Sequence, residues 1–125
     1  MPLKVLIVDD EPFAREDLRY MLAKHQDIEV IWEAGKVEEA RNILARNSPD
    51  VIFLDVQLRG GSGFDLLPDI RSTPASIVFV TAHGNFEKEA LESGAVDFLF
   101  KPVAADRLAD SLTKAKVEAK WVLYE

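Results

Sequence analysis

The sequence contains five short apolar runs, and each is followed by a segment in which apolar and polar residues are mixed. The runs are Leu3–Val8, Ile28–Trp32, Val51–Leu54, Ile77–Val80 and Phe98–Phe100. Four of the five are nearly continuous rather than alternating, which is typical of strands buried on both faces. All are strand-sized and far shorter than a membrane span. The pattern predicts five strands in a sheet that is covered on both sides.

Apolar residues recur at helical spacing between these runs. The clearest stripes are Ala14, Leu18, Met21 and Leu22, then Val37, Ala40 and Leu44, and finally Leu108, Leu112, Ala115 and Ala119 in a helix that begins near Ala104. Two shorter helices are expected over Phe64–Ile70 and Phe86–Leu91. Five β–α units in succession predict an α/β fold, a doubly wound and flavodoxin-like parallel sheet of five strands in the order 2-1-3-4-5.

The composition narrows the class of protein. A chain of 125 residues that is 48% hydrophobic and 30% charged fits a single domain, which we place at residues 1–120, with 121–125 as the end of the last helix or the start of a linker. The absence of cysteine excludes disulfides, thiolate metal sites and cysteine nucleophiles. The net charge of −7 disfavours direct nucleic-acid binding. Without a signal peptide or membrane span, we expect a cytoplasmic location and no membrane partner.

Polar side chains stand where the predicted strands end. Asp9 and Asp10 follow the first run, Asp55 the third, Thr81 the fourth and Lys101 the fifth. Open α/β sheets bind their ligands outside the carboxyl ends of the strands, where the strand order reverses. In the order 2-1-3-4-5 the first and third strands are neighbours at that point. We therefore expect three carboxylates and one ammonium group in one crevice.

This cluster is electrostatically unbalanced. Asp9, Asp10 and Asp55 contribute −3 and Lys101 contributes +1, which leaves −2 in a small volume. Either one carboxyl group is protonated or a divalent cation binds. Oxygen ligands without His or Cys suit Mg²⁺, with Mn²⁺ as an alternative. The neutralised site would then accept an anionic substrate such as phosphate, and a carboxylate can serve as a phosphoryl acceptor.

Short motifs around these residues resemble the signature of response-regulator receiver domains. The matching segments are Val8-Asp9-Asp10-Glu11, Asp55 within Phe-Leu-Asp-Val-Gln-Leu, Val80-Thr81-Ala82 and Phe100-Lys101-Pro102, in the family's order and at near-family spacing. The resemblance implies a phosphorylation-dependent switch of two-component signalling. Such a domain accepts and slowly loses its own phosphoryl group and is not a multiple-turnover enzyme.

The resemblance also implies a role for each carboxylate. Asp55 is the expected phosphoryl acceptor. Asp10 is the expected direct Mg²⁺ ligand, whereas Asp9 acts mainly through bound water. The backbone carbonyl of Gln57 is expected as a further metal ligand.

The remaining matches concern the relay of the signal. Thr81 resembles the hydroxyl that follows the phosphoryl group, Lys101 its ion-pair partner, and Phe98 the aromatic residue of the switch. The Lys101-Pro102 bond matches one that is usually cis in the family. Arg59 departs from the pattern, because many receivers have proline there, and we expect an altered loop but unchanged chemistry.

Most of these residues also have an ordinary structural interpretation. Asp9 and Asp10 suit a helix N-cap, Lys101 suits the solvated surface, and Thr81 and Phe98 suit a strand end and the core. Each interpretation is less favoured because the motifs occur together.

Two further features lie near the predicted site. Gly60–Gly63 could cradle a phosphate, but it lacks the spacing of the known phosphate loops and is interpreted as a turn. His83, two residues after Thr81, is a candidate to tune the lifetime of the phosphoryl group.

The expected partners are a sensor histidine kinase or phosphotransfer protein and, on phosphorylation, a second copy of the chain. The dimer would form through the face of the fourth helix, fifth strand and fifth helix. The fifth helix carries a heptad-like seam that we expect to extend past the sheet beyond Ala115, namely Ala105, Leu108, Leu112, Ala115, Ala119 and Val122.

Segments 61–65 and 101–103 look similar to receivers coupled to LytTR-type DNA-binding domains, which suggests control of transcription through a DNA-binding output domain. Two rival functions remain open. One is a receiver-like interaction module that works without phosphorylation. The other is a flavin- or nucleotide-binding enzyme, although that class needs Gly, Ser or Thr where this chain has Asp9-Asp10.

Overall fold

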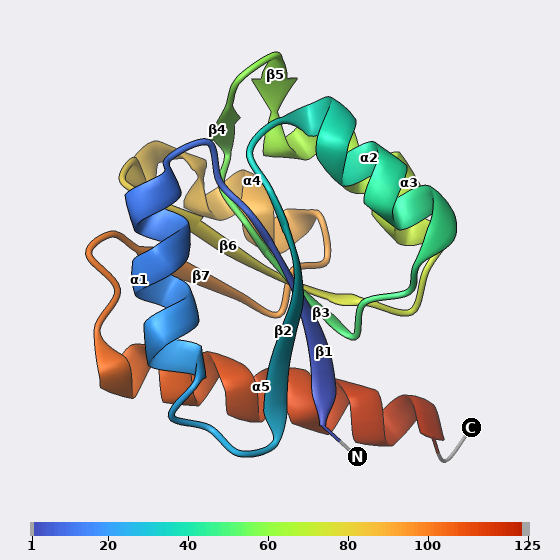
Figure 1. The fold of residues 1–125 in the computed structure, drawn as a ribbon, viewed down its shortest axis with the longest axis vertical. Helices are drawn as coiled ribbons and strands as arrows, with labels where there is room; N and C mark the ends of the chain where they lie inside the picture. Colours follow the sequence, from blue (N-terminus) through green and yellow to red (C-terminus); the bar gives the residue numbers. More distant parts are fainter. Residues whose placement is uncertain (1, 124–125) are drawn as a thin grey trace.

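The computed structural model describes residues 2–123, with the backbone alone for residues 119–123. A five-stranded parallel sheet forms its centre, in the order β2-β1-β3-β6-β7 (Figure 1). The strands are β1 (Leu3–Val8), β2 (Ile28–Ala34), β3 (Val51–Leu54), β6 (Ser76–Thr81) and β7 (Asp97–Phe100). Counted among these five, the order is the predicted 2-1-3-4-5, so the predicted fold is confirmed.

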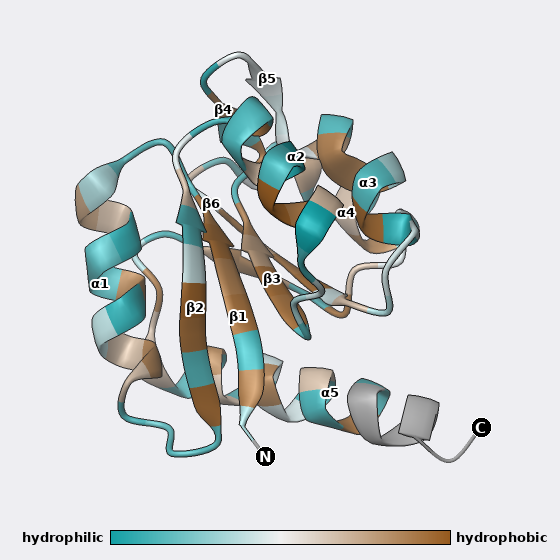
Figure 2. Ribbon diagram, turned by 45° about the vertical axis from the view of Figure 1, so that its right-hand side comes forward, coloured by the Kyte–Doolittle hydropathy of each residue, from teal (hydrophilic) through white to brown (hydrophobic). Residues whose placement is uncertain are grey.

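Helices cover both faces of the sheet. On one face lie α1 (Pro12–Leu22) and α5 (Ala105–Leu123), and on the other lie α2 (Val37–Arg46), α3 (Leu67–Arg71) and α4 (Glu87–Glu92) (Figures 1 and 2). Neighbouring residues of the central strands point into opposite cores. Leu6 and Leu54 pack with α2, α3 and α4, whereas Val5 and Phe53 pack with α1 and α5. The apolar runs are continuous because both faces of each central strand are buried.

The chain between β3 and α3 is more elaborate than the sequence predicts. It forms a small antiparallel hairpin of β4 (Gln57–Leu58) and β5 (Gly61–Ser62), followed by the 3-10 turn η1 (Gly63–Leu66). Gly60 has φ 82 in this hairpin, a left-handed conformation that glycine adopts at little cost. The segment predicted as one turn, Gly60–Gly63, thus comprises the hairpin turn at Gly60, strand β5 and the first residue of η1. A second 3-10 turn, η2 (Gly84–Phe86), precedes α4.

Helix α5 lies along the sheet for most of its length. Leu108, Leu112 and Ala115 are buried as predicted, whereas Ala105 is exposed, so the seam does not begin there. The helix still contacts the sheet one turn past Ala115, where Glu118 accepts a 2.7 Å hydrogen bond from Ser76 at the start of β6.

The sequence also predicts a seam and a linker at the C-terminal end of this helix. The side chains of Ala119 and Val122, and residues 124–125 of the expected linker, lie outside the described part of the chain. Within residues 2–123 no helix has an apolar stretch that could cross a membrane.

Candidate functional site

The predicted polar residues meet at the carboxyl ends of the central strands. Asp9 and Asp10 follow β1, Asp55 follows β3, Thr81 ends β6, and Lys101 follows β7. One carboxylate oxygen from each of the three aspartates lies within 4.8 Å of the others. The crevice predicted from the strand order is present in the structure. A cavity of about 180 Å³ opens there, lined by residues that include Asp10, Asp55, Thr81 and Lys101.

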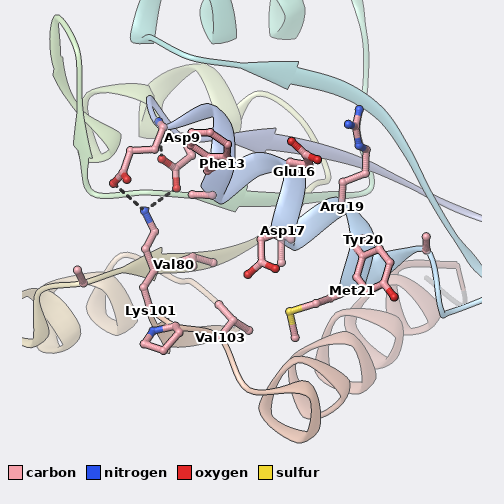
Figure 3. A pocket seen from close by; sticks show the side chains of 16 residues that line it. Asp9, Phe13, Glu16, Asp17, Arg19, Tyr20, Met21, Val80, Lys101 and Val103 are labelled. Carbon is pink, nitrogen blue, oxygen red and sulfur yellow. Dashed lines mark hydrogen bonds and ion pairs between the residues drawn. The ribbon is translucent and has the colours of Figure 1, made fainter.

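Lys101 bridges two of the carboxylates. Its Nζ lies 2.6 Å from Asp9 Oδ2 and donates a 2.8 Å hydrogen bond to Asp55 Oδ2 (the pair with Asp9 is drawn in Figure 3). Only 18% of the Lys101 side chain is exposed, which excludes the solvated-surface interpretation. Burial acts against the charge of Lys101, but its hydrogen bonds to Asp55 and Asp9 outweigh burial and raise the pKa of Lys101. The peptide bond from Lys101 to Pro102 is cis, as expected.

Asp55 is the most confined carboxylate of the cluster. The residue is buried, and its Oδ1 accepts a 3.2 Å hydrogen bond from the backbone N–H of Gln57. Burial raises the pKa of Asp55 above its ordinary value, and the charge of Asp9 adds to this, although Lys101 acts in the opposite direction. The site therefore disfavours the ionised form of Asp55 as long as no further positive charge is present.

Asp9 and Asp10 differ in what surrounds them. Asp9 is buried, and its Oδ1 accepts a 2.9 Å hydrogen bond from the backbone N–H of Glu11. The hydrogen bonds and ion pairs among the described residues of the cluster involve Asp9 and Asp55 but not the Asp10 carboxylate. Neither aspartate is the N-cap of α1, because that position is Glu11. Asp10 is thus free to act as a ligand.

The cluster has the donor set that a hard divalent cation requires. Its three carboxylates converge, they exceed the positive charge of Lys101, and one of them carries a raised pKa. Gln57, an exposed residue, also lines the cavity. Asp9, Asp10 and Asp55 therefore fit a bound Mg²⁺.

The two predicted switch residues are both buried. Thr81 is fully buried, and its Oγ1 accepts a 3.4 Å hydrogen bond from the backbone N–H of His83. Phe98 is only 4% exposed and packs edge-to-face on Phe100, with the ring centroids 5.2 Å apart. Phe98 thus lies in the core in this structure, with Phe100 covering it.

Two contributors to the site are not evident from the sequence. A Cβ at Gly63 would collide with the carbonyl oxygen of Asp55, so this position requires glycine for steric reasons. The sequence marks the glycine as part of a turn but not as a contact. Arg15 reaches the site from α1 and donates a 2.5 Å hydrogen bond to the backbone oxygen of Asp9. No motif predicts that contact.

Comparison with known proteins agrees with this geometry. Residues 5–113 match the family model of the response regulator receiver domain. The chain is 40% identical over 116 residues to the sensory transduction proteins LytT of Bacillus anthracis and LytR of Staphylococcus haemolyticus. These alignments cover 91% of this chain but 47% and 45% of the two relatives, so the chain spans about half the length of the curated relatives it matches.

Solved structures show the same fold. The response regulatory domain of protein mrkE from Klebsiella pneumoniae aligns with a TM-score of 0.84 at 30% identity, over 92% of this chain and 96% of that one. The REC domain of AraT, a response regulator from Geobacillus stearothermophilus, aligns with a TM-score of 0.81 at 32% identity, over 99% and 98%.

The chain therefore belongs to the response regulator receiver domain family of two-component systems. Members of this family are signalling proteins rather than classical enzymes, and they bind Mg²⁺ at an acidic pocket. The predicted resemblance is confirmed, including the likeness to the LytT and LytR group.

Proposed function

We propose that the protein is a phosphorylation-dependent signalling switch in which Asp55 accepts a phosphoryl group from the phosphohistidine of a sensor kinase. The observation that carries this proposal is the position of Asp55, buried at the end of β3 and held by Lys101 beside two further carboxylates. An Asp55 carboxylate oxygen attacks phosphorus, the P–N bond to histidine breaks, and the imidazole leaves with its bonding electron pair. The product is an aspartyl phosphate.

The metal-binding residues in this proposal are Asp9, Asp10 and Asp55, with the backbone carbonyl of Gln57 as a further ligand of Mg²⁺ or Mn²⁺. The ion, when bound, supplies positive charge to the phosphoryl oxygens. Lys101 holds Asp55 in place and offers its ammonium group to one phosphoryl oxygen. Because the ammonium already lies 2.8 Å from Asp55 Oδ2, little reorganisation is needed.

Thr81 and Phe98 are proposed to relay the reaction to the surface. A phosphoryl group on Asp55 offers the Thr81 hydroxyl a charged acceptor, and such a hydrogen bond is worth about 1.5–3 kcal/mol. When Thr81 turns toward the phosphoryl group, it vacates space beside β7, where Phe98 packs on Phe100. His83 also lines the cavity and is placed to affect how long the phosphoryl group survives.

A groove beside α1 suits the approach of the kinase or phosphotransfer protein. Its volume is about 1140 Å³, and it shares Asp9, Glu11 and Lys101 with the surroundings of the acidic site (Figure 3). Apolar side chains lie along it, among them Phe13, which is 85% exposed, and Tyr20, which is 67% exposed. A partner seated in this groove would hold its phosphohistidine close to Asp55.

The output of the switch is proposed to be transcription. This proposal is supported by the relatives named LytT and LytR and by their length, about twice that of this chain. We further propose that residues 1–120 form the receiver domain and that the protein is cytoplasmic. DNA would be bound by a separate output domain and not by this receiver domain.

Labelling with acetyl phosphate in Mg²⁺ tests the proposal. We expect one phosphoryl group per chain, and none in Asp55→Asn, because the amide oxygen is a poor nucleophile. Asp17→Asn is the matched control, since Asp17 is an exposed aspartate on the nearby helix α1. Equal labelling of the wild type and Asp55→Asn would contradict the proposal, and no labelling of the wild type would favour the phosphorylation-independent module. A flavin or nucleotide absorbance spectrum of the purified protein would favour the enzyme instead.

A further inference from the structure

Arg15 joins three segments that meet beside the acidic cluster. Its Nη1 donates the 2.5 Å hydrogen bond to the backbone oxygen of Asp9, and its Nε lies 3.4 Å from Glu33 near the end of β2. The guanidinium also lies against Gly35, where an added Cβ would come within 3.1 Å of Nη1. The side chain is 20% exposed, so these contacts lie largely out of solvent.

The contact with Asp9 acts on Asp10. The carbonyl oxygen of Asp9 and the N–H of Asp10 belong to one rigid peptide plane. A hydrogen bond that fixes this oxygen therefore also fixes the direction of the N–Cα bond of Asp10. The Asp10 carboxylate takes part in none of the hydrogen bonds and ion pairs of the described cluster, so its orientation depends on its backbone.

Arg19 provides a comparison within the same helix. Its Nη1 lies 2.7 Å from Glu33, so both arginines pair with one carboxylate. Arg19 is 54% exposed and makes no described contact with Asp9. The two arginines thus share a partner, a helix and a charge, but Arg15 is more buried and it alone donates a described hydrogen bond to the Asp9–Asp10 peptide.

We propose that Arg15 is a positioning residue of the metal site, which orients Asp10 toward the ion by holding the Asp9–Asp10 peptide plane. Glu33 and Gly35 serve this role by anchoring the guanidinium and leaving room for it. The inference rests on the proposed function only in requiring that the acidic cluster bind a divalent cation.

Positioning and simple electrostatics predict opposite effects of removing Arg15. Loss of a positive charge near a cation site strengthens cation binding if charge alone matters. Loss of an oriented ligand weakens it, and partners behind metal ligands are typically worth 10–100-fold in affinity. We therefore expect Arg15→Ala to raise the Mg²⁺ dissociation constant by about tenfold, the lower end of that range. Arg15→Lys, which keeps the charge and one donor, should fall between the wild type and Arg15→Ala.

Calorimetric titration with Mg²⁺ at constant ionic strength tests this inference, with Arg19→Ala as the matched control. The control should bind within about twofold of the wild type, since it loses a charge but not the contact with Asp9. Thermal unfolding without Mg²⁺ establishes that each variant is folded at the titration temperature. An Arg15→Ala dissociation constant equal to or below that of the wild type overturns the role of Arg15. No Mg²⁺ binding by the wild type overturns the proposed metal site as well.

Discussion

Asp55 is held in an environment that works against its own charge. It is 5% exposed, it faces the carboxylate of Asp9, and burial raises the pKa of Asp55 despite the ion pair with Lys101. A carboxylate of this kind destabilises the fold when it ionises. The same arrangement favours the binding of a cation beside Asp55, and it favours reactions that remove the negative charge of the Asp55 carboxylate. Stability is thus lowered at the residue proposed to react.

The Asp55→Asn variant should therefore be more stable than the wild type at neutral pH without Mg²⁺. Because the folded-state pKa of Asp55 is raised, the wild type loses stability as the pH rises through it, and an uncharged amide does not. A gain of about 1 kcal/mol corresponds to a rise in Tm of about 4 °C for a domain of this size. The gain should disappear in acid, where Asp55 is protonated in both states.

Thermal unfolding of the two proteins from about pH 3, below the ordinary aspartate pKa of about 3.9, up to about pH 8 measures this difference. Asp17→Asn is again the control, because Asp17 is an exposed aspartate on α1, away from the cluster. A lower Tm for Asp55→Asn at neutral pH would mean that the ion pair with Lys101 outweighs burial.

At the scale of the elements, a buried aspartate outside the acidic cluster ties β7 to α5. Asp97 at the start of β7 accepts hydrogen bonds from Ser111 at 2.5 Å and from Arg107 at 3.2 Å, both on α5, and Lys114 lies 3.4 Å away. Burial favours the neutral form, but the hydrogen bonds from Ser111, the Phe98 backbone and Arg107 outweigh it and lower the pKa of Asp97. The strand that carries Phe98 and the helix beside it are thereby joined next to the proposed switch.

We expect Asp97→Asn to destabilise the fold by about 2 kcal/mol at neutral pH, because hydrogen bonds to a charged group are lost. The sign with pH is opposite to that for Asp55. Because the pKa of Asp97 is lowered in the folded state, its charge contributes its full stability when the pH is above the pKa of the unfolded state. That stability is lost as the pH falls through the pKa of the folded state. Urea unfolding at neutral pH and in acid measures this difference, which should shrink in acid. An equal difference at both pH values would show that the charge of Asp97 contributes nothing.

These elements also show what the sequence reveals and what it hides. The runs from Leu3 and Val51 predict buried strands because both of their faces are apolar, and the strand order then brings Asp9, Asp10 and Asp55 together. The hairpin of β4 and β5 has two residues per strand, too few for any periodicity. Asp97 interrupts an apolar run, so that the predicted strand begins one residue late.

Contacts made by long polar side chains are hidden for a different reason. Arg15 reaches the backbone of Asp9 and the side chain of Glu33, which are distant from each other in sequence. Such a contact depends on the path of three segments and leaves no local pattern. Motifs therefore predict the residues proposed to react, and the structure adds those that hold them.

At the scale of the whole molecule, two grooves lie on the surface. The groove beside α1 adjoins Asp9 and Lys101, whereas a second groove of about 430 Å³ lies between α4, β7 and α5. Leu91, 47% exposed, and Phe100, 48% exposed, line the second groove, and Phe98 lies at its base. A change at Phe98 therefore reaches this second groove directly. In this proposal the signal enters at the groove beside α1 and leaves at the groove between α4, β7 and α5.

We predict that phosphorylation promotes a two-fold symmetric dimer through this second groove. Phe100 would carry the signal, since its ring packs on Phe98 and against Gly84 in the segment that follows Thr81. Sedimentation velocity with and without beryllofluoride, a mimic of the phosphoryl group, measures the association. Leu91→Lys should abolish the beryllofluoride-induced dimer by placing a charge in the groove. Ile31→Lys is the matched control, because Ile31 is 43% exposed on β2, at the opposite edge of the sheet from β7. A wild type that stays monomeric in both conditions at high micromolar concentration would contradict the prediction, and equal loss in both variants would place the interface elsewhere.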